Sequence, residues 1–366
     1  MTYRLILASL ICMMSVYISS CSKQSMESKQ IHLIDSSTDM IEVNTLVADS
    51  MWIKLENIPE AMIGDVKRII EHDGTIYILN ISSKKGLIAF DCNGKYLNAI
   101  GQQGNGEGEF ADIIDFAVNT STGKIAILTP NSTIYIYNSN GKFEKEFRPT
   151  ESLLWHISFN GEHYICSTDH CTYTEGDNAF LLYVFTQDFH LVGKYIPVLS
   201  QQMPSTSMFE GMLTTIGKET YYMDMFNNSL YEIKNGEQPM SLYSFSLPDP
   251  MPISVFTGGM TFYEQQTKHD WIKSFMPLHE SFFLTYVVGG HLCMARISNE
   301  GDIVSSGLVG GILPKMFPGN NKTILSPVTK EEYLVDWQDV PYKNVLVKDL
   351  EDNVMLLRWR LKDVHK

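Results

Sequence analysis

Residues 101–110, "GQQGNGEGEF", contain four glycines and two glutamates and form the densest candidate motif of the chain. The backbone amides of a glycine-rich loop can cradle a phosphate when the loop leads into a helix. A dinucleotide fingerprint would need a third glycine after Gly104 and Gly106, but Glu109 occupies that position. No helical periodicity and no Walker lysine follow, so we expect no nucleotide cofactor at this loop.

Calcium is the alternative ligand for the same loop, because oxygen-bearing side chains alternate at Asn105, Glu107 and Glu109. The spacing is nevertheless not that of an EF-hand. We favour a third interpretation, in which the loop is a turn between strands. Its glycines would then supply unusual backbone angles, and Phe110 would pack in the core.

Three aspartates lie inside apolar, strand-like runs: Asp115 in "IIDFAV", Asp224 in "YMDMF" and Asp336 in "LVDWQ". A buried carboxylate is costly unless it is hydrogen-bonded, paired or bound to a metal. We favour hydrogen bonds to turns or neighbouring strands, and we keep these three residues as candidate metal ligands. No Gly-x-Ser-x-Gly nucleophile motif is present, and we predict no catalytic residue.

The first residues, "MTYRLILASLICMMSVYISSC", place Arg4 before an almost continuous apolar run over 5–18 and small residues before Cys21. This pattern is typical of a secretory signal peptide, and the run is shorter than the roughly 20 residues that span a bilayer. The segment "ISSC" resembles the bacterial lipobox, in which the cysteine is acylated. Cleavage of an ordinary signal peptide nearby is the alternative. We predict a lipoprotein signal peptide over 1–20 and lipidation of Cys21.

Removal of the signal and acylation of Cys21 would leave four cysteines, namely Cys92, Cys166, Cys171 and Cys293. Cys166 and Cys171 are close in sequence, so in an oxidising compartment they would form either a disulfide or two buried thiols. His163 and His170 lie in the same stretch, "HYICSTDHC". This spacing matches no structural zinc pattern, and we expect no metal there.

The composition indicates a folded globular protein: of 366 residues, 44% are hydrophobic, 11% aromatic and 19% charged. The formal net charge is −14, and the lysines and arginines do not gather in one stretch. Binding to a phosphate backbone requires a basic face. We therefore expect no nucleic-acid partner.

Two segments of the chain can be aligned, "TIYILNISSKKGLIAFDCNGKYLNAIG" from residue 75 and "KIAILTPNSTIYIYNSNGKFEKEFRP" from residue 124. Ile76 and Ile125 are 49 positions apart, and Gly94 and Gly141 are 47 positions apart. Each segment has strand-like runs and an Asn-Gly pair, which supplies the positive φ of a tight hairpin turn. A hairpin period near 50 residues is typical of a β-propeller. About 320 residues would make six blades, with five or seven as alternatives.

These patterns predict an all-β protein in three parts: a signal peptide over 1–20, a flexible polar tether over 21–45 and a six-bladed β-propeller over 46–366. The runs "SMWIKLEN" at 50–57 and "DNVMLLRWRLK" at 352–362 are both strand-like. We expect these N- and C-terminal strands to pair and close the ring, which would remove an exposed sheet edge.

The chain resembles the bacterial six-bladed β-propeller lipoproteins, whose blades are similar to NHL repeats. The matching pieces are "WIKLEN", "GDVKRI", "IAFDCNGKYLNAIGQQGNGEGEF", "DIIDFAV", "IYIYNSNGKF", "MFNNSLYEI" and "DNVMLLRWRLK". The run at 101–110 is the most specific, because that family places a similar run between its first blades. Glu107 and Val354 stand where the family commonly has proline. Much of the family has no assigned activity, so the resemblance implies a fold and an envelope location rather than a reaction.

We expect a monomeric, lipid-anchored protein of the cell envelope, facing the periplasm or the outer surface and touching the membrane through its N-terminal lipid only. It would act as a non-enzymatic binding or interaction module without a cofactor, for a partner that is a protein, a peptide or a glycan. The alternative is a metal-dependent hydrolase or lyase of the propeller lactonase or lyase type. In that case Asp115, Asp224 or Asp336 would converge on the central channel. A purely structural envelope component is a third hypothesis.

Overall fold

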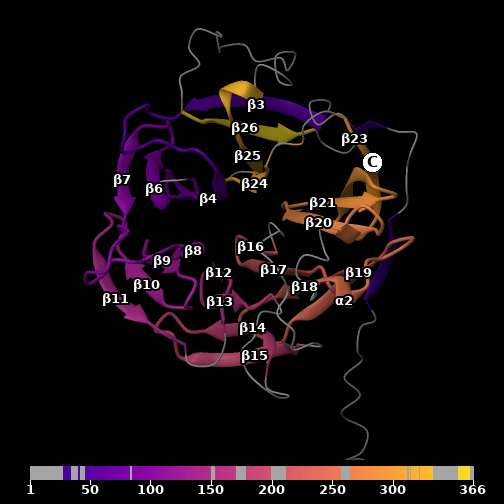
Figure 1. Ribbon diagram of the computed structural model, residues 1–366, viewed down its shortest axis with the longest axis horizontal. Helices are drawn as coiled ribbons and strands as arrows, with labels where there is room; N and C mark the ends of the chain where they lie inside the picture. Colours follow the sequence, from indigo (N-terminus) through magenta and orange to yellow (C-terminus); the bar gives the residue numbers. More distant parts are fainter. Residues whose placement is uncertain are drawn as a thin grey trace, which may run out of the picture.

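The computed structural model describes residues 28–33, 40–41, 46–82, 85–149, 153–169, 179–198, 212–256, 264–310, 313, 315–320, 322–332 and 353–362. Six sheets, each built on an antiparallel meander, follow one another around a ring, which confirms the predicted all-β fold and the six-bladed β-propeller (Figure 1). The innermost strands of neighbouring sheets lie beside one another around the centre of the ring.

Each of the first three blades is a plain meander whose strands follow the chain from the centre outward. The first blade consists of β4 (Val66–His72), β5 (Thr75–Asn80), β6 (Gly86–Asp91) and β7 (Tyr96–Ile100). The second consists of β8 (Asp115–Val118), β9 (Ile125–Leu128), β10 (Ile134–Tyr137) and β11 (Phe143–Phe147). The third consists of β12 (His156–Phe159), β13 (Tyr164–Ser167), β14 (Phe180–Phe185) and β15 (Leu191–Pro197).

The fourth and fifth blades each gain a fifth, outermost strand from the N-terminal segment. The fourth blade contains β16 (Leu213–Ile216), β17 (Glu219–Asp224), β18 (Ser229–Ile233) and β19 (Met240–Ser246), and β1 (Lys29–His32) pairs with β19 in parallel. The fifth contains β20 (Trp271–Pro277), β21 (Ser281–Val288), β22 (His291–Ser298) and β23 (Ile303–Val309), and β2 (Met40–Ile41) pairs with β23 in parallel. A short helix, α2 (Ile253–Phe256), lies between β19 and β20.

The strands β1 and β2 differ from the prediction of a flexible tether over 21–45. Ile31 of β1 and the adjacent Leu33 are almost fully buried, and the Leu33 amide donates to the carbonyl of Ser246 at 2.9 Å. Burial of these apolar side chains against the fourth blade stabilises the paired segment. Part of the predicted tether therefore belongs to the outer edge of the ring.

The sixth blade combines three strands from the C-terminal part of the chain with one strand that precedes the first blade. It consists of β24 (Phe317–Pro318), β25 (Thr323–Val328), β26 (Met355–Leu361) and β3 (Val47–Lys54). β26 pairs antiparallel with β3, from Met355 opposite Lys54 to Leu361 opposite Val47. β3, which precedes the first blade in the sequence, is thus the outermost strand of the last blade, and Figure 1 shows β3 and β26 side by side.

The two Asn-Gly pairs occupy equivalent turns, between β6 and β7 and between β10 and β11, as the alignment of the repeats predicts. Gly94 has φ 87° and Gly141 has φ 77°, angles that glycine adopts at low cost. A Cβ at Gly94 would lie 2.2 Å from the Lys54 carbonyl oxygen, and one at Gly141 would lie 2.4 Å from that of Ala99. Both glycines therefore let a turn pack against the outermost strand of the preceding blade.

The hydrophobic core consists mainly of layers between neighbouring blades. Phe110 lies in the layer between the first and second blades with 2% of its surface exposed, which confirms its predicted packing. The loop around it joins β7 to β8, and the Glu109 carboxylate accepts the Gly106 amide at 2.8 Å. The most motif-like stretch of the sequence is thus a turn between blades, as expected.

Candidate functional site on the inner strands

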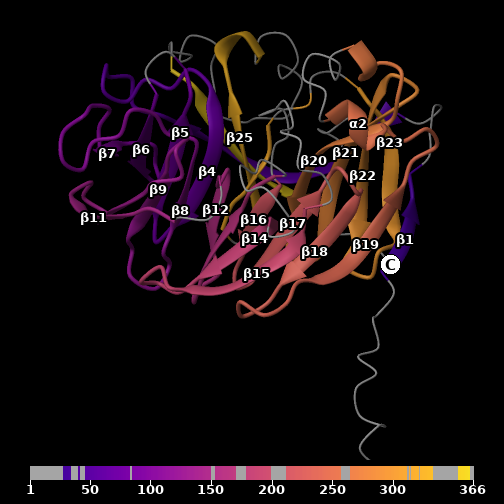
Figure 2. The ribbon, with the colours of Figure 1, turned by 60° about the horizontal axis from the view of Figure 1, so that its bottom comes forward.

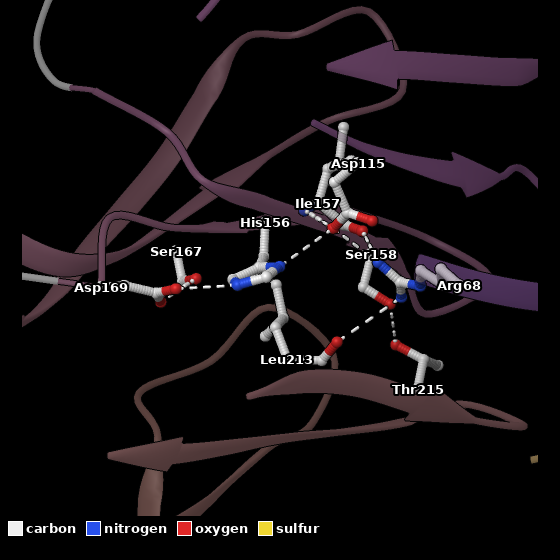
Figure 3. Close-up of polar contacts among 9 residues, drawn as sticks. All are labelled: Arg68, Asp115, His156, Ile157, Ser158, Ser167, Asp169, Leu213 and Thr215. Atoms are coloured by element: carbon white, nitrogen blue, oxygen red, sulfur yellow. Dashed lines mark hydrogen bonds and ion pairs between the residues drawn. The ribbon is translucent and has the colours of Figure 1, made fainter. Parts of the chain in front are cut away.

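Four ionisable side chains from the first three blades meet at the inner strands (Figure 3). Arg68 lies on β4, Asp115 on β8 and His156 on β12, which are the innermost strands of their blades. Asp169 follows β13 of the third blade. We call these four residues the inner-strand network.

Asp115 is the centre of the inner-strand network, and only 1% of its side chain is exposed. Its Oδ2 accepts a hydrogen bond from Arg68 Nη1 at 2.6 Å and another from the Ile157 backbone amide at 2.9 Å. His156 Nδ1 lies 3.3 Å from the same oxygen. One carboxylate oxygen thus connects the first, second and third blades.

His156 lies between two carboxylates. Its Nε2 is 2.8 Å from Asp169 Oδ2, while its Nδ1 faces Asp115. Asp169 is itself oriented by the Ser167 hydroxyl, which donates to Oδ1 at 2.7 Å. Because both ring nitrogens face acceptors, this arrangement favours the imidazolium, in which both nitrogens carry a proton.

The ionisation of these groups follows from their contacts. Burial opposes the charge of Asp115, but Arg68 and His156 outweigh this effect and hold the pKa of the carboxyl well below its usual range. Burial likewise opposes the charge of His156, yet Asp169 and Asp115 raise the pKa of the imidazole to about 9. Around neutral pH the network therefore contains two cations and two anions.

Hydroxyl groups extend the polar contacts to the fourth blade. Ser158 Oγ on β12 lies 2.6 Å from Thr215 Oγ1 on β16, which lies 2.7 Å from Thr220 Oγ1 on β17. Arg68 Nη1 also donates to the Ile157 carbonyl at 2.9 Å. These contacts make the polar region a bridge across neighbouring blades, as Figure 3 shows.

The protonation states decide what the inner-strand network can do chemically. A general base must be unprotonated and a general acid protonated near the working pH. His156 is protonated and Asp115 is ionised around neutral pH, but the raised pKa makes the imidazolium a weak acid and the lowered pKa makes the carboxylate a weak base. The arrangement is well suited to holding inner strands together, because each charge is paired and hydrogen-bonded.

The structure places the candidate metal ligands in different surroundings. Asp115 belongs to the inner-strand network, whereas the buried Asp224 ends β17, and its Oδ1 accepts the Phe226 amide at 3.1 Å while its Oδ2 accepts Asn227 Nδ2 at 2.7 Å. Asp336 lies outside the described residues. Within the described ranges, no group of three or more His, Cys, Asp or Glu side chains is arranged to hold a metal ion.

The structure describes only some of the cysteines for which the sequence makes a prediction. Cys166 is a buried free thiol in β13, and burial raises its pKa above the usual range. Cys171, with which it would form a disulfide in one of the two alternatives, and the predicted lipidation site, Cys21, lie outside the described residues. Among the residues that the structure does describe, none lies in a helix with the length and apolar character needed to cross a bilayer.

Sequence reasoning identified Asp115 but missed Arg68, His156 and Asp169. Asp115 could be found because it is a carboxylate inside an apolar run. Such a carboxylate is buried, and a buried charge needs a cation, a metal ion or hydrogen-bond donors beside it. The sequence does not indicate which cations pair with Asp115, because Arg68 and His156 lie 47 and 41 positions away from it.

The fold and the inner-strand network define a six-bladed β-propeller in which charge pairs link the inner strands of the first three blades. The chain belongs to the family described as "Domain of unknown function (DUF4934)", which matches residues 28–345. That match begins one residue before β1, in agreement with the pairing of the N-terminal segment with the ring.

Two solved structures share the fold. A predicted exported protein of Bacteroides fragilis NCTC 9343 is 17% identical, with a TM-score of 0.71 over 92% of this chain and 99% of its own. A member of the DUF4221 family from Bacteroides vulgatus ATCC 8482 is 9% identical, with a TM-score of 0.59 over 86% of this chain and 97% of its own. No curated protein matches the chain. At these identities the structural matches show the fold alone.

Proposed function

We propose that this protein is a lipid-anchored β-propeller of the bacterial envelope that acts as a non-enzymatic binding or interaction module. The observation that carries the proposal is the inner-strand network. The ionisable groups that converge there are paired with one another, and their pKa values are shifted in the directions that strengthen this pairing and weaken them as proton donor and acceptor. A rigid ring is a suitable scaffold for binding loops.

The envelope location is supported by the signal-like N-terminus ending at Cys21 and by the fold shared with a predicted exported protein. Two or more acyl chains anchor a protein stably, because each buried CH₂ contributes about 0.8 kcal/mol. The resemblance to propeller lipoproteins with NHL-like blades leads to the same location. The partner would be a protein, a peptide or a glycan, and no cofactor is required.

The first test concerns the anchor. The wild-type protein should carry acyl chains on Cys21 and separate with the membranes, whereas Cys21→Ser should be released or remain unprocessed. Mass spectrometry of the N-terminal peptide and membrane fractionation measure both properties. A wild-type protein that is unacylated and released from membranes would contradict the anchor.

The second test concerns the module. Chemical crosslinking in the native envelope, followed by mass spectrometry, should capture the same partner reproducibly, and that partner should bind the purified propeller. Titration calorimetry with calcium or zinc tests the hydrolase alternative. A dissociation constant below about 10 μM, near −7 kcal/mol, that is lost in Asp115→Asn would favour metal chemistry over the proposal. Loss of binding in Asp224→Asn instead would also favour metal chemistry, but at the second candidate ligand, outside the inner-strand network.

A further inference from the structure

An asparagine followed by a glycine can lose its side-chain amide without a second protein, and the chain contains five such pairs. The glycine nitrogen attacks the asparagine Cγ, ammonia leaves, and water opens the resulting succinimide to aspartate or isoaspartate. The pairs begin at Asn93, Asn105, Asn140, Asn160 and Asn235. The attack requires a glycine amide and an asparagine side chain that are both able to turn, so the fold decides which pair reacts.

Hydrogen bonds hold the glycine amide in three of the five pairs. The amides of Gly94 and Gly141 each donate to a backbone carbonyl of their own hairpin turn, at 3.0 Å and 2.9 Å. The Gly106 amide donates to Glu109 Oε2 at 2.8 Å. Turning any of these nitrogens toward the asparagine side chain would break its hydrogen bond. These three turns therefore protect their asparagines.

The fourth pair is held by the asparagine side chain itself. Asn160 is only 3% exposed, and its Oδ1 accepts the Glu162 amide at 3.1 Å and the His163 amide at 2.7 Å. Turning the carboxamide toward Gly161 would break both bonds. This is costly because the polar groups would be left unpaired in a buried place.

The turn between β18 and β19 contains the fifth pair and lacks these restraints. Asn235 is exposed and has φ 51°, and Gly236 has φ 70°. The Glu237 amide donates to the Lys234 carbonyl at 2.9 Å, so the four residues form a type I′ turn. Within the described part of the chain, the Gly236 amide makes no hydrogen bond. Both groups that must turn are therefore unrestrained.

The peptide between Asn235 and Gly236 can rotate while the rest of the turn stays in place. A type II′ turn has the same positive φ at its first central residue as a type I′ turn, and the two differ in the orientation of the central peptide. Glycine at the second central position adopts the φ of either type. The rotation directs the Gly236 nitrogen toward the Asn235 side chain, as closure of a five-membered ring requires.

A base from the third blade lies beside this turn of the fourth blade. A Cβ at Gly236 would lie 3.0 Å from His163 Nδ1, which therefore lies at most about 5.5 Å from the Gly236 nitrogen by standard bond lengths and angles. His163 Nδ1 is buried and has no hydrogen-bond partner among the described residues. The Tyr195 hydroxyl donates to the Gly236 carbonyl at 3.0 Å and ties the turn to the third blade, which Figure 2 shows beside the fourth. At this distance a general base acts directly after a small movement or through one water.

We propose that Asn235 is a site of self-catalysed deamidation, in which His163 takes the proton of the Gly236 amide. The bond from the Gly236 nitrogen to the Asn235 Cγ forms, and the bond from Cγ to Nδ2 breaks. His163 returns the proton to the leaving nitrogen, which departs as ammonia. One water then opens the succinimide to aspartate or isoaspartate. The modification goes beyond the proposed function and adds a negative charge to an exposed turn.

Peptide mapping by mass spectrometry tests the selectivity in a single sample of the purified protein, incubated at neutral pH in water enriched in oxygen-18. Asn235 should incorporate the heavy oxygen at least about fivefold faster than the other four asparagines, because each of those must first give up a hydrogen bond. Asn105, Asn160 and Asn235 are all followed by Gly-Glu, so in urea these three should react at similar rates. Equal rates in the folded protein, or a faster reaction at another pair, would overturn the proposal.

His163→Gln tests the base. The reaction at Asn235 should slow by at least about tenfold, since a positioned general base contributes about 10²–10⁴-fold. His190→Gln, which changes an exposed histidine of the β14–β15 turn, should leave the rate unchanged. An unchanged or faster reaction in His163→Gln, with the circular dichroism of the wild type, would overturn the role of His163. If that variant does not fold, His163→Asn replaces it, and the selectivity of the wild type still tests the site.

Discussion

Replacing His156 with glutamine should make the stability of the propeller respond differently to pH. In the folded protein the imidazole lies between Asp115 and Asp169, and its pKa is raised to about 9. In the unfolded chain a histidine has a pKa of about 6.5. Folding therefore strengthens proton binding at His156, and this difference contributes to the free energy of unfolding.

The sign and size of the effect follow from these two values. Below about pH 6.5 the residue is protonated in both states, so its stabilising contribution is fully present. As pH rises from about 6.5 to 9, the unfolded state loses its proton first and the contribution declines. The difference of about 2.5 pKa units corresponds to about 3 kcal/mol, which should be gone above pH 9.

Urea unfolding of the wild type and of His156→Gln between pH 6 and pH 9 measures this contribution. The stability difference between the two proteins should shrink by about 3 kcal/mol over this range. The comparison with the variant removes the effects of other groups that titrate in both proteins. The control is His190→Gln, an exposed histidine of the β14–β15 turn, whose difference from the wild type should stay nearly constant. A pH-independent difference for His156→Gln would refute the imidazolium.

Two further predictions concern packing and are checked by urea denaturation. Phe110→Ala should lower the free energy of unfolding by about 3–5 kcal/mol because the ring is buried, whereas the exposed Glu107→Gln should change it by less than about 0.5 kcal/mol. Trp359→Ala in β26 should cost about 3–5 kcal/mol, because the indole is 1% exposed and donates to Ser326 Oγ at 3.1 Å. Arg360→Ala on the same strand removes only an exposed ion pair with Asp49 and should cost less than about 1 kcal/mol. Similar losses for buried and exposed members of either pair would contradict the assigned packing.

The repeating architecture could be predicted from the sequence because its signals are local. Alternating apolar residues and Asn-Gly turns mark hairpins, and the 47-residue spacing of Gly94 and Gly141 reflects equivalent turns that pack against the preceding blade. The N-terminal strands were harder to find. β1 is only four residues long, and its signal is the alternation of Ile31 and Leu33 in an otherwise polar segment.

The inner-strand network could not be predicted in the same way, because its geometry depends on contacts between blades. The pairing of β4 with β5 shifts between Val66 and Arg68, which leaves Lys67 as an extra residue beside the arginine. Such a β-bulge bends its strand and can redirect a side chain. A one-residue change of register turns a side chain to the other face of a sheet. The contact between Arg68 and Asp115 thus depends on a local irregularity that hydrophobic periodicity does not reveal.

The same network explains why a buried aspartate on an inner strand is a weak guide to catalysis. Burying a carboxylate in a propeller has to be compensated, and a metal, a cation or several hydrogen-bond donors can each provide the compensation. At Asp115 the compensation comes from Arg68, His156 and the Ile157 amide, which lie on two other blades. Removing Asp115 would leave two cations facing each other near the third blade, so a loss of function in Asp115→Asn needs a stability measurement beside it. Only a loss of binding or turnover in a folded variant would implicate the carboxylate in chemistry.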